Sequence, residues 1–340
     1  MESRVNHQSR AARLHGQWTG WVAGAIFALA TMAAVLLAIP PVEAAPPMVP
    51  GATYVGSDTC KGCHQDMADK MEHSLHGKLL GTKLSKNEFQ ARGCEGCHGP
   101  GSKHLEDQAN PQFNLRFGKK SVWRAADQNS ACLQCHAKGK QMLWQGSPHE
   151  SRDVTCVTCH SVHGPRSDKA QLKLVKPEQY DSRGQALDSV EYDLCGQCHQ
   201  VRAMQFNRSS HMPSPARGEA GKITCGSCHN PHGSITEKLI AADSVNQNCT
   251  SCHADKRGPF LWEHAPVLEN CLTCHQAHGS NNAPLLRVRV PRLCETCHSG
   301  GRHNAQTYPM TDRRAFNRSC VNCHLNIHGS NHPSGERFLR

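Results

Sequence analysis

The stretch Cys94-Glu-Gly-Cys-His98 carries the pattern that decides the fold: two cysteines three positions apart, with a histidine directly after the second. Cys271-Leu-Thr-Cys-His275 repeats it, and ten copies in all use the twenty cysteines of the 340-residue chain. The copies are Cys60/Cys63/His64, Cys94/Cys97/His98, Cys132/Cys135/His136, Cys156/Cys159/His160, Cys195/Cys198/His199, Cys225/Cys228/His229, Cys249/Cys252/His253, Cys271/Cys274/His275, Cys294/Cys297/His298 and Cys320/Cys323/His324.

This pentapeptide is the attachment motif of c-type haem. The two thiols add to the two vinyl groups of a porphyrin, and the histidine that follows becomes an axial ligand of the iron. Two other uses of paired cysteines fit less well. A zinc ribbon needs no histidine after the second cysteine, and a disulfide framework needs no fixed spacing. The sequence therefore predicts ten covalently attached c-type haems.

Residues 1–45 have the order of a secretory signal peptide. Three arginines precede an apolar run at residues 21–39, and small residues follow, with a cleavage point after Ala44 or Ala45. The apolar run is long enough to serve instead as an uncleaved membrane anchor, an alternative that its Ala-rich composition weakens. In both cases we expect residues 46–340 outside the cytoplasm, where c-type haem is attached.

The composition offers little material for an apolar core. Aromatic residues make up 5% of the chain, and the mean hydropathy is −0.59. Because little periodic apolar sequence is present, the porphyrins have to supply the core, and folding and haem insertion should be one event. We expect a multihaem c-type cytochrome with mostly short α-helices and irregular loops wrapped around a haem chain, and with little or no sheet.

The net charge of +10 does not indicate a nucleic-acid-binding protein. Removal of residues 1–44 takes away three arginines and two glutamates and leaves +9. Each haem brings two propionates, so about twenty negative charges need counter-charges from scattered Lys and Arg. A nucleic-acid face would require a basic block interleaved with aromatic residues, and the sequence has none.

The remaining histidines follow a repeat of five units, which begin at Cys60, Cys132, Cys195, Cys249 and Cys294. Each unit contains a first motif, a spacer with one histidine (the spacer histidine), a second motif and a histidine soon after it (the trailing histidine). The spacer histidines are His76, His149, His211, His264 and His303, and the trailing histidines are His104, His163, His232, His278 and His328. The sequence therefore predicts two axial histidines for every iron, with His73 and His332 as surplus.

Methionine is the competing axial ligand and would raise the reduction potential, but no methionine recurs at a fixed place in the unit. Three trailing histidines, His163, His232 and His278, each lie three residues after a motif histidine. Side chains three residues apart share a helix face, so they cannot bind opposite sides of one iron. We expect each of these histidines to serve a different, neighbouring haem and to hold the haems close together.

Stretches outside the motifs carry a resemblance to a known family. They are the Gly-Pro after Cys94-Glu-Gly-Cys-His, Asn207-Arg-Ser-Ser-His, residues 249–280 with Arg257-Gly-Pro and Leu261-Trp-Glu-His-Ala-Pro-Val, and the C-terminal His328-Gly-Ser-Asn-His-Pro-Ser-Gly. With these and all ten motifs, the chain from about residue 55 to 340 resembles the periplasmic decahaem c-type cytochromes of the MtrA, PioA and DmsE type. The N-terminal region, His73 and the loops 171–190 and 213–222 depart from that family.

The resemblance implies an elongated haem chain of two pentahaem halves, residues 46–205 and 206–340. It implies a periplasmic protein associated with the outer membrane, which carries electrons to or from the cell exterior through a porin-like β-barrel partner. Extracellular metal reduction and Fe(II) oxidation are the implied processes. Periplasmic or inner-membrane cytochromes and an outer-surface multihaem cytochrome are the implied redox partners. A barrel would be needed because an irregular backbone cannot be satisfied in lipid.

Two other functions stay open. A multihaem oxidoreductase enzyme needs an open iron position, commonly marked by Lys in place of the motif histidine or by a missing second ligand. The sequence has neither mark, so we expect an electron carrier without a catalytic haem. A freely soluble periplasmic electron shuttle is separated from the conduit by the resemblance alone.

Overall fold

The computed structural model describes residues 48–164, 166, 170–174, 190–211, 223–298 and 319–339. These residues belong to one contact-defined unit, Ala45–Arg340. The predicted signal peptide, His303 and most of the two loops 171–190 and 213–222 lie outside the described residues.

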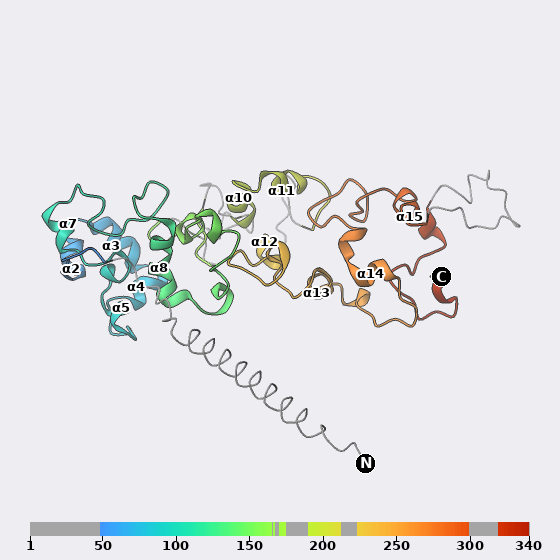
Figure 1. Ribbon diagram of the computed structural model, residues 1–340, viewed down its shortest axis with the longest axis horizontal. Helices are drawn as coiled ribbons and strands as arrows, with labels where there is room; N and C mark the ends of the chain where they lie inside the picture. The colour runs from blue at the N-terminus through green and yellow to red at the C-terminus, as the bar shows by residue number, and fades with distance from the viewer. Residues whose placement is uncertain are drawn as a thin grey trace, which may run out of the picture. The chain divides into compact units, whose positions relative to one another are not determined.

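Short helices joined by irregular connections make up the described chain (Figure 1). The α-helices are α2 (Ser57–Lys61), α3 (Gln65–Glu72), α4 (Leu75–Leu79), α5 (Glu88–Ala91), α6 (Cys94–His98), α7 (Ser102–Glu106), α8 (Ala125–His136), α9 (Cys156–Cys159), α10 (Val190–Gly196), α11 (Gln200–Gln205), α12 (Cys225–Cys228), α13 (Val245–Thr250), α14 (Ala265–Glu269) and α15 (Arg292–Glu295). The 3-10 helices are η1 (Gly139–Gln141), η2 (Glu150–Arg152), η4 (Glu237–Leu239), η5 (Ala254–Lys256), η6 (Cys271–Thr273), η7 (Cys320–Asn322) and η8 (Gly335–Arg337). The longest of them, α8, has 12 residues.

The part of the chain that the structure describes contains no β-strand. It has isolated antiparallel bridges, such as those that join His160 to Leu172 and His229 to Ile240. The predicted multihaem cytochrome fold of short helices and irregular loops, with little or no sheet, is confirmed. Among the described helices, none has the length and apolar character needed to cross a membrane.

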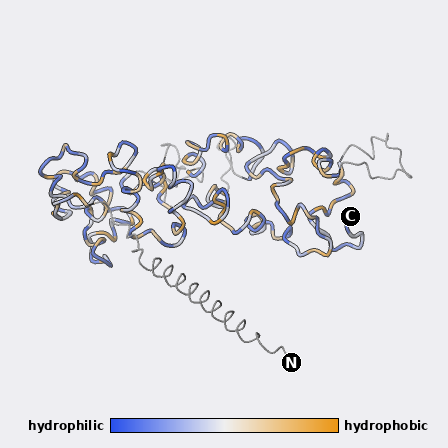
Figure 2. Tube along the Cα trace, viewed as in Figure 1, coloured by the Kyte–Doolittle hydropathy of each residue, from blue (hydrophilic) through white to orange (hydrophobic). Residues whose placement is uncertain are grey.

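Few apolar side chains are buried. They are Leu115, Ala131, Trp144, Val190, Leu194, Phe206 and Leu286. Figure 2 shows apolar residues scattered along the trace between hydrophilic ones. Several buried side chains are instead polar, and Glu95 and Asn129 are among them. Hydrogen bonds from such side chains therefore take over part of the organising role that an apolar core usually has.

One of these side chains ties the two motifs of a unit together. Asn129 in α8 lies three residues before Cys132, and its Oδ1 accepts a hydrogen bond of 2.8 Å from the backbone N–H of Cys156. Its Nδ2 donates to Val154 O at 3.0 Å. The start of the second motif is thereby fixed on the helix that ends in the first motif.

In three other units, too, a side chain of the first helix accepts a hydrogen bond from a backbone N–H at the start of the second motif. We name this contact the motif clamp. The corresponding bonds join Asn246 Oδ1 to Cys271 N (2.8 Å), Ser57 Oγ to Cys94 N (3.1 Å) and Glu191 Oε2 to Gly226 N (2.6 Å). Asn and Ser suit this role because their short polar side chains readily accept from the free N–H groups at a helix start.

Glycine after a trailing histidine allows close contact with the preceding unit. Gly233 has φ 125°, and a Cβ there would overlap Leu143 O. Gly279 has φ 139°, and a Cβ there would overlap Gln205 O. Both overlapped atoms are backbone oxygens of the preceding unit, so any larger side chain would push two neighbouring units apart.

Candidate haem sites

The two motifs of a unit occupy opposite ends of helices. Each first motif has its first cysteine late in a helix, in α2, α8, α10, α13 and α15. Each second motif begins a helix at its first cysteine, in α6, α9, α12, η6 and η7. In four second motifs the preceding residue is Thr, Asn or Ser with extended backbone, which is typical of a helix N-cap.

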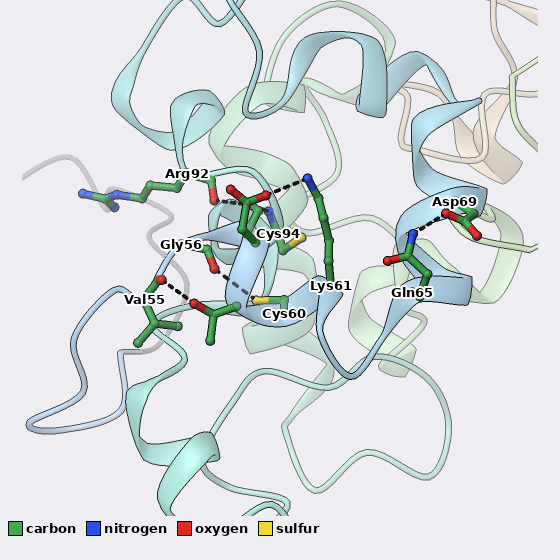
Figure 3. Close-up of polar contacts among 11 residues, drawn as sticks. Val55, Gly56, Cys60, Lys61, Gln65, Asp69, Arg92 and Cys94 are labelled. Atoms are coloured by element: carbon green, nitrogen blue, oxygen red, sulfur yellow. Dashed lines mark hydrogen bonds and ion pairs between the residues drawn. The ribbon is translucent and has the colours of Figure 1, made fainter.

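The first cysteines of the two motifs in one unit interact directly. Figure 3 shows Cys60 and Cys94 of the first unit close together. The other pairs are Cys132 with Cys156, Cys195 with Cys225, Cys249 with Cys271 and Cys294 with Cys320. A hydrogen bond between the thiols raises the pKa of Cys132 and lowers the pKa of Cys156.

Three pairs of second cysteines instead connect neighbouring units. Cys97 interacts with Cys135, Cys159 with Cys198, and Cys274 with Cys297. Burial raises the pKa of the Cys97 thiol to about 11, with a smaller contribution from Cys135. Contacts within units and between units alternate, so these successive motifs are neighbours in the order of the sequence.

Cys63 and Cys252 are the second cysteines of two further first motifs. Both are exposed, as Cys135 and Cys198 are, and they follow the C-cap residues of α2 and α13. Cys228, which the pattern would place against Cys252, interacts with Cys249 instead, and Cys252 Sγ accepts a 3.8 Å hydrogen bond from the adjacent Ser251 Oγ. The attachment of Cys63 and Cys252 to haem, like that of the other motif cysteines, stays a prediction from the motif spacing.

Nine motif histidines among the described residues each face one spacer or trailing histidine, with ring centroids 5.9 to 6.3 Å apart. The pairs are His64–His104, His98–His163, His136–His76, His160–His232, His199–His149, His229–His278, His253–His211, His275–His328 and His298–His264. An imidazole nitrogen binds a transition metal at about 2 Å, so two rings on opposite sides of one ion have centroids roughly 6 Å apart. The spacing of the pairs therefore fits one iron between each two rings.

The ring planes of these pairs form two classes. Three pairs, all at first motifs, have steep interplanar angles of 65°, 76° and 66°, for His136–His76, His199–His149 and His253–His211. The other six have angles from 10° to 32°. The structure thus contains two kinds of histidine pair.

The pairing follows a rule that the sequence did not reveal. A spacer histidine faces the first motif of the next unit, as His76 faces His136. A trailing histidine faces the second motif of the preceding unit, as His163 faces His98. His104 departs from the rule, because it faces His64 in its own unit. The pairs agree with the expectation that a trailing histidine avoids the motif histidine three residues earlier. The reason given for it was wrong, because α9, α12 and η6 end before the motif histidine and the two residues share no helix.

Backbone carbonyls fix the orientation of seven of these rings, and of the motif histidine His324, through Nδ1. In the second motifs, the contacts are His98 to Leu115 O (2.8 Å), His160 to Ala170 O (2.8 Å), His229 to Lys238 O (2.8 Å), His275 to Pro284 O (3.1 Å) and His324 to Arg337 O (2.5 Å). The spacer histidines make His149 to Pro231 O (2.8 Å), His211 to Ala277 O (3.5 Å) and His264 to Ile327 O (3.0 Å). A carbonyl can only accept, so Nδ1 carries the hydrogen and Nε2 keeps its lone pair. Metal-binding histidines in proteins typically have this arrangement.

Burial keeps several of these imidazoles neutral. It lowers the pKa of His232 to about 4, with a further contribution from His160. It lowers the pKa of His278 to about 4 as well, with help from Arg202 and His229. Neutral imidazole is the form that binds a metal, so the environment favours the ligating state.

The two surplus histidines lie apart from the pairs. His73 is exposed at the C-terminal end of α3. His332 Nδ1 accepts a hydrogen bond of 3.1 Å from Ser334 N–H, so in the neutral ring Nε2 carries the hydrogen. His303, the last spacer histidine, lies outside the described residues. Paired cysteines with two imidazoles form the donor set of a c-type haem, and the residues present fit that group.

Comparisons with known proteins agree with this donor set. Residues 94–182 match the family described as cytochrome c-type protein NrfB-like, and residues 215–258 and 264–303 match the doubled CXXCH motif family. The chain is 30% identical over 157 residues to the cytochrome c-type protein NrfB of Haemophilus influenzae, which covers 41% of this chain and 63% of that protein. It is 23% identical over 265 residues to the C-type cytochrome OmcS of Geobacter sulfurreducens, with 72% and 57% covered.

A more extensive match concerns the multiheme cytochrome MtrA of Shewanella baltica. The identity is 38% over 296 residues, which span 84% of this chain and 81% of that protein. The match covers most of both chains and therefore confirms the resemblance seen in the sequence. The chain binds c-type haem, transfers electrons, and belongs to the MtrA family of multihaem c-type cytochromes.

Proposed function

We propose that the chain carries ten covalent haems, each between two histidines, and conducts electrons between the periplasm and the cell exterior through an outer-membrane β-barrel. The observation that carries the proposal is the set of nine histidine pairs with centroids 5.9 to 6.3 Å apart. The tenth haem belongs to Cys320 and Cys323, where His324 is the motif histidine and His303 is the partner left by elimination.

A bound haem supplies a one-electron redox centre. The chain's own residues do the rest. The cysteines would hold the group in place, and two imidazoles would bind its iron, so a substrate would find no open position there. This donor set supports an electron carrier over a multihaem oxidoreductase.

The arrangement of the cysteines supports a continuous path. First cysteines interact within units, as Cys132 does with Cys156, and second cysteines interact between units, as Cys159 does with Cys198. Consecutive haems would then be neighbours, and an electron would need no long jump between the two pentahaem halves, residues 46–205 and 206–340.

Membership in the MtrA family supports the barrel partner and a periplasmic, outer-membrane-associated location after export by the signal peptide. A bilayer is about 40–45 Å thick with its headgroups, and a chain of irregular backbone needs a polar sheath to cross it. Periplasmic or inner-membrane cytochromes would exchange electrons at one end, and an outer-surface multihaem cytochrome at the other. We expect the barrel to contact the loops 171–190 and 213–222.

Haem content and ligation are the first test. Intact mass should show ten haem additions to a chain that begins near residue 45 or 46, and eight or fewer in matured protein would reject the count. The oxidised protein should give low-spin paramagnetic resonance signals of two shapes, because ring-plane angle sets the shape and two classes of pair exist. A large high-spin signal, or prompt carbon monoxide binding to several reduced haems, would contradict two-histidine ligation and favour the enzyme.

Liposomes with an internal redox dye test the conduit. The purified complex of this chain with its barrel should pass electrons across the membrane, whereas the barrel alone should not. Equal rates with and without the chain, or a failure of the two proteins to co-purify, would leave the soluble periplasmic shuttle as the better account.

A further inference from the structure

The segments after the second motifs of units two to five end in the same backbone shape. We name them return loops: residues 160–172, 229–240, 275–286 and 324–338. The first is described at residues 160–164, 166 and 170–172. Each loop leaves the motif histidine and comes back to it, so that a carbonyl near the loop's end accepts the hydrogen bond from Nδ1 of that histidine.

The residue directly after the accepting carbonyl is left-handed in all four loops, and in none is it glycine. The φ angles are 51° at Gln171, 58° at Leu239, 59° at Leu285 and 51° at Phe338. Among the seven described non-glycine residues with positive φ, Asp153 alone lies outside the return loops. A left-handed conformation costs free energy for any residue with a Cβ, so its recurrence at one structural position points to a role.

The left-handed residue lets two successive carbonyls face the same motif. In the fourth unit, Pro284 O accepts from His275 Nδ1 at 3.1 Å, and the next carbonyl, Leu285 O, accepts from Gln276 N–H at 2.7 Å. In the third unit, Leu239 O accepts from Asn230 N–H at 2.8 Å. The two bonds hold the imidazole and the chain just beyond it to the same turn.

The first unit reaches a similar contact without a left-handed residue. Leu115 O accepts from His98 Nδ1 at 2.8 Å, and Leu115 N–H donates back to His98 O at 2.9 Å. Leu115 is only 1% exposed, so packing fixes this carbonyl. The return loops have no such buried anchor at the accepting residue, since Lys238 and Pro284 are exposed. In these loops the backbone conformation therefore has to hold the accepting carbonyl in place.

We propose that Gln171, Leu239, Leu285 and Phe338 are positioning residues that keep a carbonyl on Nδ1–H of the motif histidine and thereby lower the reduction potential of its haem. The inference rests on the axial ligation proposed above. A hydrogen bond from Nδ1–H makes an imidazole a stronger donor, which stabilises the ferric state of the iron that it binds.

Two substitutions at Leu285 separate backbone from side chain. Leu285→Ile keeps the size and apolar character but adds a branch at Cβ, which disfavours positive φ. Leu285→Asn removes the apolar side chain but tolerates the left-handed conformation. The same pair at Leu239 repeats the test in another unit, should one Leu285 variant fail to accumulate.

The haem-loaded full chain is titrated potentiometrically, and exchange of the histidine Nδ1 hydrogens is followed by nuclear magnetic resonance in the reduced protein. With Leu285→Ile, we expect one haem component to move to higher potential and one Nδ1 hydrogen to exchange about fivefold faster or more, as loss of a hydrogen bond predicts. Leu285→Asn should leave the haem potential and the exchange rate close to those of the native protein. Leu239→Ile should shift the potential of a different haem and speed the exchange of a different Nδ1 hydrogen.

Unchanged potential and exchange in both Ile variants would overturn the proposal. So would an Asn variant that shifts as far as the Ile variant, because the side chain would then be responsible. Failure of the underlying ligation is visible separately: the unsubstituted protein would already show high-spin haem or bind carbon monoxide.

Discussion

The first unit and the fourth unit differ in where the trailing histidine finds its partner. In the first unit, the trailing His104 turns back onto His64 of its own unit, with ring centroids 6.3 Å apart. In the fourth, the trailing His278 reaches His229 in the unit before it, at 6.1 Å. The comparison teaches that the later units exchange trailing histidines with a neighbouring unit, whereas the first unit makes a local pair.

The two units also differ in what holds them. In the first unit the buried carboxylate of Glu95 accepts from the backbone N–H groups of Val55 (2.9 Å), Gly56 (2.8 Å) and Gly101 (2.9 Å). The fourth unit is tied to its neighbour instead, since His264 Nδ1 donates to Ile327 O of the fifth unit at 3.0 Å. Both units also have a motif clamp, but the first unit adds the internal contacts of Glu95, whereas the fourth adds this hydrogen bond to the next unit.

The largest effect should come from Gly279→Ala, which attacks the contact between units. The new Cβ would overlap Gln205 O, and φ of 139° is a conformation that almost only glycine adopts. We expect a loss of about 3 kcal/mol or more, measured by urea unfolding of the haem-loaded protein. The matched control is Gly118→Ala after the first unit, where φ is 113° but no atom lies within 4 Å of the new Cβ. Equal losses would show that backbone strain, and not contact between units, sets the cost.

Glu95→Gln should cause the next largest loss of stability, because it disrupts hydrogen bonds inside the first unit. Oε1 of Glu95 accepts from Val55 and Gly101, and Oε2 accepts from Gly56. In glutamine one oxygen becomes an NH₂ group that faces an N–H donor, so we expect a loss of about 2 kcal/mol in urea unfolding. Glu88→Gln is the control, because that side chain is 78% exposed. If the two variants unfold alike, the buried carboxylate does not hold the first unit.

The sequence predicted the motifs, the short helices and the absence of sheet because these follow from local spacing and composition. It placed the spare histidines in units but could not assign each to its partner, since His76 passes the motif at His98 to face His136. Such a choice depends on which segments lie side by side, and no local pattern encodes it. The left-handed residues could not be predicted either, because leucine, found at positions 239 and 285, rarely adopts positive φ.

Loss of a motif clamp should have a moderate effect. Asn129→Leu keeps the side chain's size but leaves Cys156 N–H and Val154 O without their 2.8 and 3.0 Å partner. We expect a loss of about 1–3 kcal/mol in urea unfolding. Ser57→Ala removes the weaker clamp of the first unit, whose bond to Cys94 N–H is 3.1 Å, and should cost less. A larger loss for Ser57→Ala than for Asn129→Leu would show that bond length does not rank the two clamps.

Exchange of a trailing histidine for methionine should change potentials more than stability. His278→Met should raise the potential of the haem at His229, because methionine is a weaker donor to ferric iron. His104→Met should raise the potential of the haem at His64, in its own unit. Potentiometric titration with single-haem spectra distinguishes the two. A shift at the haem of His275, three residues before His278, would contradict the exchange of ligands between units.

The smallest effect should come from the histidines that the pairing leaves over. His73 is exposed after α3, and its removal in His73→Ala should change unfolding by no more than about 0.5 kcal/mol and no haem potential at all. His332→Ala removes the acceptor of Ser334 N–H, so it should cost slightly more stability, about 0.5–1 kcal/mol, again without a change in potential. The reason is that His328 already faces His275, and a ring whose Nδ1 accepts a backbone N–H has its Nε2 hydrogen where a lone pair would be needed. If His332→Ala converts one haem to high spin while His328→Ala does not, the fifth unit uses the later histidine, and the rule drawn from the inner units stops short of it.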